Sequence, residues 1–243
     1  MSNEYINDIF KNYNKFHTLY LDSCDEYKLN WFYKYVKKNY LPFFDDKDKS
    51  TIKILEIGCN KGYLLKVLSD LGFNRTFGID LSPDDLEIAK TISPDSQVEC
   101  LNALFYLNDK LEFFDVVILK AVLEHIPKGD IIPILDKIKS SLKPEGIVII
   151  DVPNMDWLFA SHERYMDFTH QVGFTKESLS QLLRSLFLKS EIFPVDNWNP
   201  TSYTGVFKKK IARFILGKLL CWADPEGASN PIWCRSIVGV GYK

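Results

Sequence analysis

Hydrophobic and polar positions alternate in blocks between residues 51 and 154. Short runs rich in Val and Ile are separated by longer segments whose apolar residues recur at helical spacing. The short runs predict five strands, at "IKILEIG", "RTFGIDLS", "QVECLNAL", within "FFDVVILKAVLEHI" and at "IVIIDVPN". Segments 63–72, 83–92 and 131–146 predict helices between them. Strands that alternate with helices favour an α/β fold with a doubly wound parallel sheet, and uninterrupted apolar runs are typical of strands buried on both faces.

The segments on either side of this region break the alternation. Before it, aromatic residues at helical spacing predict an amphipathic helix at 25–41. After it, the pattern predicts an irregular, aromatic loop at 155–175, a helix at 176–187, a strand near 190–195, an irregular segment at 197–232 with a basic helix at 206–222, and a final strand at 234–243.

Composition narrows the class of protein. The chain has 243 residues, of which 46% are hydrophobic, so it can build one sizeable core. Its net charge of −2 argues against a general nucleic-acid binder. Five scattered cysteines without a CxxC motif predict free thiols and a cytoplasmic protein. The start "MSNEYINDIF" does not resemble a signal peptide, and we expect no transmembrane segment.

A glycine turn with two acids is the clearest sign of a ligand site. Gly58 and Gly62 follow the first strand, Glu56 lies just before them, and Asp80 ends the second strand. An acid in the position of Asp80 can accept hydrogen bonds from the two hydroxyls of a ribose. A dinucleotide fingerprint would need further glycines in this turn, and their absence argues against a nicotinamide-dependent oxidoreductase. The carboxylate of Glu56 would repel a pyrophosphate, but it suits a ligand that carries an ammonium and a sulfonium.

The motifs "ILEIGCNKG", "GIDLS" and "DVVILKAVLEHIP" together resemble the successive cofactor motifs of class I S-adenosylmethionine-dependent methyltransferases. The resemblance implies a Rossmann-like, seven-stranded sheet, mostly parallel with the last strand antiparallel. It also implies a single domain over 1–243, with an N-terminal helical lid at 1–45, a cofactor-binding core at 50–155, and substrate-side insertions at 155–175 and 197–232. The cofactor residues that it implies are Glu56, Gly58, Cys59, Asn60 and Gly62 around the methionine part, Asp80 at the ribose, Leu81, Asn102 and Ala103 at the adenine, and the backbone of Lys120 near the sulfonium.

The segment "RYMDFTHQVGFTKESLSQLL" is similar to methyltransferases encoded with bacterial surface-polysaccharide enzymes. A hydroxyl acceptor needs a base near neutral pH, and histidine is the usual one. We expect His170 to be the general base, with Asp167 orienting it or binding the acceptor. His125 is a further catalytic candidate. We expect three residues to bind substrate: His162, Arg164 at an anionic group, and Tyr165 by stacking on a sugar ring. In a purely structural alternative, Asp167 caps a turn and His170 is an ordinary loop histidine.

The function expected from these motifs is O-methylation of a sugar or small phosphorylated precursor for a capsule or other surface polysaccharide. S-adenosylmethionine is the expected cofactor, no metal is expected, and the acceptor is a small-molecule, nucleotide-linked or lipid-linked glycan precursor. Three alternatives stay open: methylation of nitrogen or of a phosphate-type oxygen on a phosphoramidate, O-methylation of a phenol or quinone precursor, and a non-catalytic partner of an active methyltransferase. The fifth strand ends in "DVPN", not in the Asn-Pro-Pro-Tyr signature of many nucleic-acid amino-methylases, so we expect no nucleic-acid partner. The basic helix at 206–222 is expected to be either a cap on the sheet edge or a peripheral membrane contact.

Overall fold

Seven strands form one twisted sheet in the computed structural model, which describes residues 9, 26–195, 203–223 and 234–243. Their order across the sheet is β3-β2-β1-β4-β5-β7-β6, and β7 alone runs antiparallel to its neighbours. The predicted Rossmann-like fold is therefore confirmed. The strands are β1 (Lys53–Ile57), β2 (Arg75–Asp80), β3 (Gln97–Cys100), β4 (Phe114–Lys120), β5 (Leu142–Pro153), β6 (Lys189–Val195) and β7 (Ser236–Tyr242).

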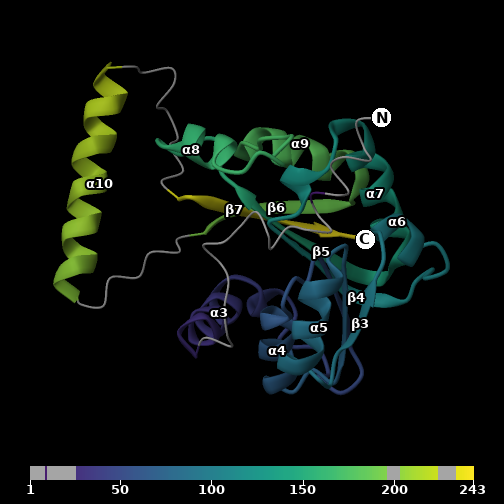
Figure 1. The fold of residues 1–243 in the computed structure, drawn as a ribbon. Coiled ribbons are helices and arrows are strands. Elements are labelled where there is room, and N and C mark those ends of the chain that lie inside the picture. The colour runs from purple at the N-terminus through teal and green to yellow at the C-terminus, as the bar shows by residue number, and fades with distance from the viewer. Residues whose placement is uncertain (1–8, 10–25, 196–202, 224–233) are drawn as a thin grey trace.

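Helices cover both faces of the sheet (Figure 1). One face carries α3, α4 and α5, the other carries α7, α8 and α9, and α10 stands apart from both layers. The helices are α3 (Glu26–Asn39), α4 (Tyr63–Asp70), α5 (Pro83–Ile92), α6 (Ala103–Tyr106), α7 (Lys128–Ser141), α8 (Ala160–Tyr165), α9 (Lys176–Leu186) and α10 (Tyr203–Ala223), with short 3-10 turns η2 (Leu41–Phe43) and η3 (Leu123–His125).

Alternate residues of the central strands supply two separate cores. In β4, Val116 and Ile118 pack towards α3 and α4, whereas Val117 and Leu119 pack towards α7 and α9. Successive side chains of a strand point to opposite faces, so a strand covered on both sides must be apolar throughout. This is the physical reason for the uninterrupted Val and Ile runs in the sequence.

Two predicted element boundaries are wrong. The third strand was expected to extend through residue 104, but β3 ends at Cys100 and Asn102 caps α6, with its side chain accepting the N–H of Leu104 at 2.9 Å. The helix predicted at 131–146 occupies 128–141 instead. Residues 143–146 form an irregular excursion within β5, where Glu145 has a φ of 62°. Short polar side chains and Pro-Gly segments carry local signals that apolar periodicity does not capture.

The two flanking segments are described only in part. Within the predicted lid at 1–45, residues 1–8 and 10–25 lie outside the described residues, and α3 packs through Tyr35 and Val36 onto the core. Within 197–232, the predicted basic helix is present as α10, and residues 196–202 and 224–233 lie outside the described residues. The loop predicted at 155–175 contains the short helix α8. None of the helices in the described ranges has both the length and the apolarity to cross a membrane.

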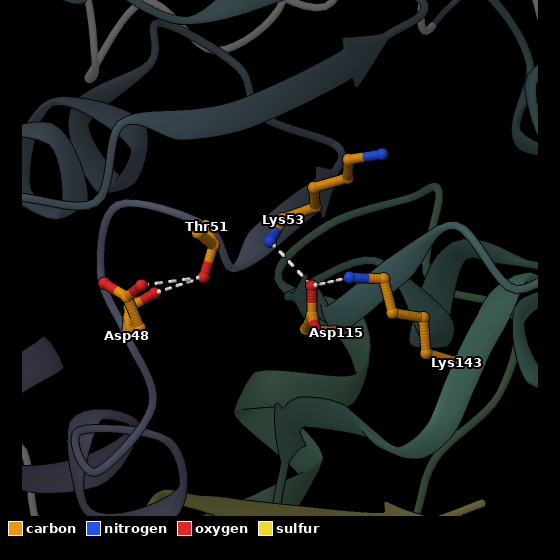
Figure 2. A network of polar contacts seen from close by, with 5 residues as sticks. All are labelled: Asp48, Thr51, Lys53, Asp115 and Lys143. Carbon is orange, nitrogen blue, oxygen red and sulfur yellow. Dashed lines mark hydrogen bonds and ion pairs between the residues drawn. The ribbon is translucent and has the colours of Figure 1, made fainter.

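Asp115 joins the amino ends of the central strands (Figure 2). Its Oδ2 accepts the backbone N–H of Lys53 at 2.8 Å and lies 2.7 Å from Nζ of Lys143. The turn before β1 is closed separately, by the hydroxyl of Thr51 donating to Asp48. This network lies at the opposite edge of the sheet from the carboxyl ends of the strands, so its role is structural.

We expect Asp115→Ala to lower the free energy of unfolding by about 2 kcal/mol, because the N–H of Lys53 loses its acceptor. The ion pair with Lys143 adds little to this value, because the lysine side chain is 34% exposed. Urea denaturation measures the change. The matched control is Asp109→Ala, which removes an exposed acid paired with Lys110 and should leave the unfolding midpoint unchanged. Equal midpoints for both variants would contradict the role given to Asp115.

Candidate active site

The turn between β1 and α4 has three residues in the left-handed region. Gly58, Asn60 and Gly62 have φ values of 74°, 45° and 76°. A Cβ on Gly58 would lie 2.4 Å from Cγ2 of Val122, and one on Gly62 would lie 3.0 Å from the Cβ of Ala89. Both glycines are therefore required by space as well as by conformation, because the turn packs tightly against its neighbours. The turn lies at the carboxyl edge of the sheet, where ligands bind in this class of fold.

Asp80 is held against this turn. Its Oδ2 accepts the backbone N–H of Asn60 at 2.8 Å, and its Oδ1 accepts the N–H of Ser82 at 2.9 Å. Burial raises the pKa of Asp80, and these two N–H donors act in the opposite direction. Each carboxylate oxygen can accept a second hydrogen bond. Asp80 is thus fixed in position with acceptor capacity left for the two hydroxyls of a ribose.

Glu56 is a buried acid at the end of β1. It is 4% exposed, and within the part of the chain that the structure describes its Oε2 is buried and has no hydrogen-bond partner. Burial raises its pKa well above the usual range, the charge of Asp80 raises it further, and Lys120 lowers it. A buried, unpaired carboxyl is costly, and an ammonium group would satisfy it. Glu56 and Asp80 therefore fit the amino-acid and ribose parts of S-adenosylmethionine.

Four other predicted cofactor residues differ in their burial and in the contacts of their side chains. The side chain of Cys59 is buried in a small core with Leu65, where burial raises the pKa of its thiol, so only its backbone borders the turn. Leu81 is half-buried after β2. The side chain of Asn102 is occupied as the cap of α6, and Ala103 packs against the core. Of the residues predicted at the adenine, Asn102 therefore has its side-chain oxygen engaged within the protein, and Leu81 and Ala103 offer apolar side chains.

Lys120 lies beneath α3, together with a buried acid that sequence reasoning missed. Its Nζ is 3.9 Å from Oδ2 of Asp151, and it lies 5.7 Å and 5.0 Å from the ring centroids of Trp31 and Tyr35. Asp151 also accepts hydrogen bonds from the hydroxyls of Tyr35 and Tyr40. Burial, followed by the charge of Asp151, raises the pKa of both tyrosines well above the usual range. The sequence signal for Asp151 was a lone acid inside the apolar run "IVIIDVPN".

The rings of two histidines lie close together at the carboxyl edge of the sheet. His125 lies in η3 and His170 in the loop after α8, and their ring centroids are 4.6 Å apart. Nδ1 of His170 lies 2.7 Å from the carbonyl oxygen of Glu163. A carbonyl only accepts, so Nδ1 of His170 carries the proton and its Nε2 carries the lone pair.

Asp167 is connected to His125 through Thr169. Oδ1 of Asp167 accepts both the N–H and the hydroxyl of Thr169, at 2.8 Å and 2.6 Å. The same hydroxyl oxygen lies 2.8 Å from Nδ1 of His125, which therefore donates to it and keeps its lone pair on Nε2. The prediction had Asp167 either orienting His170 or binding the acceptor. In the structure its carboxylate is hydrogen-bonded to Thr169, and the backbone carbonyl of Glu163 is what fixes the ring of His170.

Glu124 is a second buried acid that sequence reasoning did not select, although "LEHIP" places it beside His125. It is 2% exposed, and among the described residues neither of its carboxyl oxygens has a hydrogen-bond partner. Burial raises the pKa of Glu124 to about 8. One ligand atom each from Glu124, His125 and His170 lie within 4.8 Å of one another, and these donor types could hold a divalent cation. The expectation of a metal-free site stays a prediction.

The predicted substrate residues lie on or near α8. Arg164 donates from Nη1 and Nη2 to the backbone carbonyls of His170 and Gln171, so its guanidinium braces the loop that carries His170. Tyr165 is 77% exposed and stacks beneath Arg164, with the guanidinium carbon 5.2 Å from the ring centroid. His162 is exposed on the same helix. Of the three residues, Tyr165 and His162 are positioned to meet a molecule from solvent.

Taken together, the open sheet, the fixed acid after β2, the buried acid at the end of β1 and the histidine pair define a nucleoside-cofactor enzyme of the doubly wound α/β class. A family model described as "Methyltransferase domain" matches residues 29–187, which is more than half of the chain. The chain therefore belongs to this methyltransferase family. The predicted class, an S-adenosylmethionine-dependent methyltransferase, is confirmed.

Curated relatives match less than half of the chain. A ubiquinone biosynthesis O-methyltransferase of Rhodopseudomonas palustris (strain TIE-1) is 30% identical over 108 residues, which cover 44% of this chain and 42% of the relative. The protein of the same name from Rickettsia akari (strain Hartford) is 32% identical over 108 residues, covering 43% and 41%. The chain thus spans less than half the length of either relative.

Solved structures support the fold over a longer stretch. A methyltransferase from Archaeoglobus fulgidus described as SAM-dependent superposes with a TM-score of 0.66 at 19% identity, covering 90% of this chain and all of that one. Phosphoethanolamine N-methyltransferase 2 of Haemonchus contortus, solved with S-adenosyl-L-methionine, gives a TM-score of 0.61 at 16% identity, covering 96% of this chain and 60% of that one. At these identities the likeness shows the shared fold.

Proposed function

We propose that this protein transfers a methyl group from S-adenosylmethionine to a hydroxyl of a sugar or small phosphorylated precursor, in the cytoplasm, for a bacterial capsule or other surface polysaccharide. The observation that carries the proposal is the histidine pair at the carboxyl edge, in which Nδ1 of His170 donates to the carbonyl of Glu163 and Nε2 of His170 is left as the atom that can take a proton. An oxygen acceptor needs such a base, because a neutral hydroxyl is a weak nucleophile.

The chain's own residues divide the work of holding the cofactor. Glu56 would pair with its ammonium, and Asp80 would accept from the two ribose hydroxyls. The backbone of the turn at 58–62 would hold the methionine part, and Leu81 would contact the adenine. When bound, the cofactor supplies an electrophilic methyl group on a sulfonium. Lys120 lies on the α3 side of this turn, with its ammonium 5.7 Å and 5.0 Å from the ring centroids of Trp31 and Tyr35.

The proton leaves the acceptor through the histidine pair. Nε2 of His170 accepts it, while Nδ1 keeps its own proton and donates it in a hydrogen bond to the carbonyl of Glu163, which fixes the ring. His125 lies beside it, and Asp167 holds the ring of His125 in place through the hydroxyl of Thr169. Arg164 is a positioning residue in this scheme, because its donors hold the His170 loop. The exposed rings of Tyr165 and Phe168 are the surfaces on which a sugar ring can stack.

A phenol or quinone precursor is the second candidate acceptor, because the curated relatives are named ubiquinone biosynthesis O-methyltransferases. The same base would serve a phenolic hydroxyl. The polar, charged surroundings of the histidine pair favour the sugar or phosphorylated acceptor. A nitrogen or phosphate-type oxygen acceptor on a phosphoramidate would need no strong base.

A transfer assay with isotope-labelled S-adenosylmethionine tests the proposal. The acceptors are nucleotide-linked sugars, phosphorylated capsule precursors and dihydroxylated phenols, assayed separately. Labelled sugar supports the proposal, and labelled phenol replaces it with the second candidate. Cofactor binding without transfer to any of the acceptors would favour a non-catalytic partner of another methyltransferase.

We expect His170→Ala to lower kcat about 100-fold on a hydroxyl acceptor and to change KM little, because the base acts only as the proton leaves. The lost rate should recover in part at alkaline pH. The matched control is Lys176→Ala, which alters an exposed residue at the start of α9. A variant that keeps the wild-type kcat at neutral pH would exclude His170 as the base and direct attention to His125 or to a nitrogen acceptor.

A further inference from the structure

Helix α10 has a composition unlike any other helix of the described chain. Its 21 residues, Tyr203 to Ala223, include five basic side chains and no acidic one. Most of its other residues are apolar. The basic residues are Lys208, Lys209, Lys210, Arg213 and Lys218.

Seven large apolar side chains among the described residues of α10 are exposed to solvent, and five of them share one side of the helix. Phe207, Phe214 and Trp222 are 65%, 67% and 84% exposed, and Ile211 and Ile215 are 43% and 53% exposed. The spacing of these five residues, i, i+4, i+7, i+8 and i+15, places them on one side of the helix. The helix is about 30 Å long by its rise per residue, so the stripe is extended. Contiguous exposed apolar surface of this size marks an interaction site.

The charges on α10 decide which partner the stripe fits. Lys208 and Lys210 lie near the start of the stripe, and Lys218 lies within it, with Nζ 5.8 Å from the ring centroid of Phe214. A second copy of α10 would bring these cations against one another, with no acid on either helix to offset them. A surface that is both apolar and negatively charged satisfies both features at once. Anionic phospholipids provide such a surface, and an aromatic residue such as Trp222 is favoured at the headgroup level.

We propose that α10 lies in the surface of an anionic phospholipid bilayer, with the stripe of Phe207, Ile211, Phe214, Ile215 and Trp222 buried among the lipids. The topology relates this helix to the candidate site. Helix α10 connects the end of β6 to the start of β7, and both points lie at the carboxyl edge of the parallel strands, which is also the edge that carries the candidate site (Figure 1). The helix is thus inserted into the chain at the same edge of the sheet as the candidate site. The contact stands independently of the acceptor proposed above.

Co-sedimentation of the full chain with vesicles tests the proposal. The vesicles contain equal parts of phosphatidylglycerol and phosphatidylcholine, and pure phosphatidylcholine vesicles provide the comparison. We expect binding to the anionic vesicles at low ionic strength and a loss of binding as salt is added. The intrinsic fluorescence of the protein should shift to shorter wavelength on binding, and Trp222→Phe should remove most of that shift.

The variants separate the apolar and the electrostatic parts of the contact. The triple change Phe207→Ser, Phe214→Ser and Trp222→Ser should weaken partitioning at least about 100-fold. Lys208→Ala with Lys210→Ala should weaken it by about fivefold per lysine. The control is Leu111→Ser with Leu188→Ser, two apolar side chains outside α10 that are 76% and 88% exposed. The control should bind as the wild type does.

Two results would overturn the proposal. The first is a wild-type chain that does not bind the anionic vesicles at low ionic strength. The second is a triple variant that binds as tightly as the control. Light scattering on the same samples identifies the alternative: a wild-type dimer that the triple variant cannot form would make a second copy the partner of α10. None of these measurements depends on methyl-transfer activity. The result on membrane binding can therefore be interpreted even if the proposed function is wrong.

Discussion

Replacing Asp80 with alanine is expected to weaken the binding of S-adenosylmethionine about 10³-fold, because two charge-assisted hydrogen bonds to the ribose are lost together. The same change removes the acceptor of the Asn60 N–H, so the turn at 58–62 also loses one of its fixed points. Calorimetric titration with S-adenosylmethionine and with S-adenosylhomocysteine measures both affinities. Both should fall alike, because the two molecules share the ribose.

Asp84→Ala is the matched control for this prediction. Asp84 is an exposed acid in the first turn of α5, a few residues beyond Asp80, so its removal changes the net charge equally without touching the turn. Its affinity should stay at the wild-type value. If Asp80→Ala binds as well as Asp84→Ala does, then the ribose is not held by the acid after β2.

Glu124→Gln is expected to make the stability of the protein less dependent on pH. Burial raises the pKa of Glu124 to about 8 from an ordinary value of 4.5. Between these two values the unfolded chain loses the proton while the folded chain retains it. The stability that neutral Glu124 contributes is therefore fully present below pH 4.5 and is lost as the pH rises towards 8. The total loss is up to about 5 kcal/mol, at 1.36 kcal/mol for each unit of pKa shift.

Urea denaturation across this pH range compares the wild type with the variant. Glutamine stays neutral, so Glu124→Gln should lose less stability on the alkaline side and exceed the wild type there. Glu177→Gln, which alters an exposed acid in the first turn of α9, should follow the wild-type profile. Parallel profiles for Glu124→Gln and the wild type would show that the carboxyl of Glu124 is not held in its protonated form.

The sequence predicts most of the sheet because the sheet has a strong periodic signal. Val116 to Leu119 must be apolar on both faces, and the turn from Gly58 to Gly62 must accept left-handed backbone, so local residue types reveal both. The order of the cofactor motifs then places Glu56 and Asp80 at neighbouring strand ends.

The sequence indicates the residues of the histidine pair and its neighbours, but not the hydrogen bonds that connect them. That Asp167 reaches His125 through Thr169, and that the Glu163 carbonyl holds His170, depends on how the loop after β5 folds over η3. Contacts between segments 44 residues apart leave no periodic trace in one sequence. Arg164 shows the same limit, because a guanidinium that braces a loop and one that binds a phosphate look identical in the sequence.

The position of β7 has a consequence for synthesis of the chain. β7 pairs with β5 on one side and with β6 on the other, yet it follows both in sequence. While the ribosome is adding residues 196–235, the outer edge of β5 and the whole of β6 are already made but lack their common partner. Unpaired apolar edges of this kind favour aggregation, and contacts so distant in sequence form slowly. The nascent chain is therefore most exposed to misassembly late in translation, when a chaperone that shields strand edges would raise the yield of folded enzyme most.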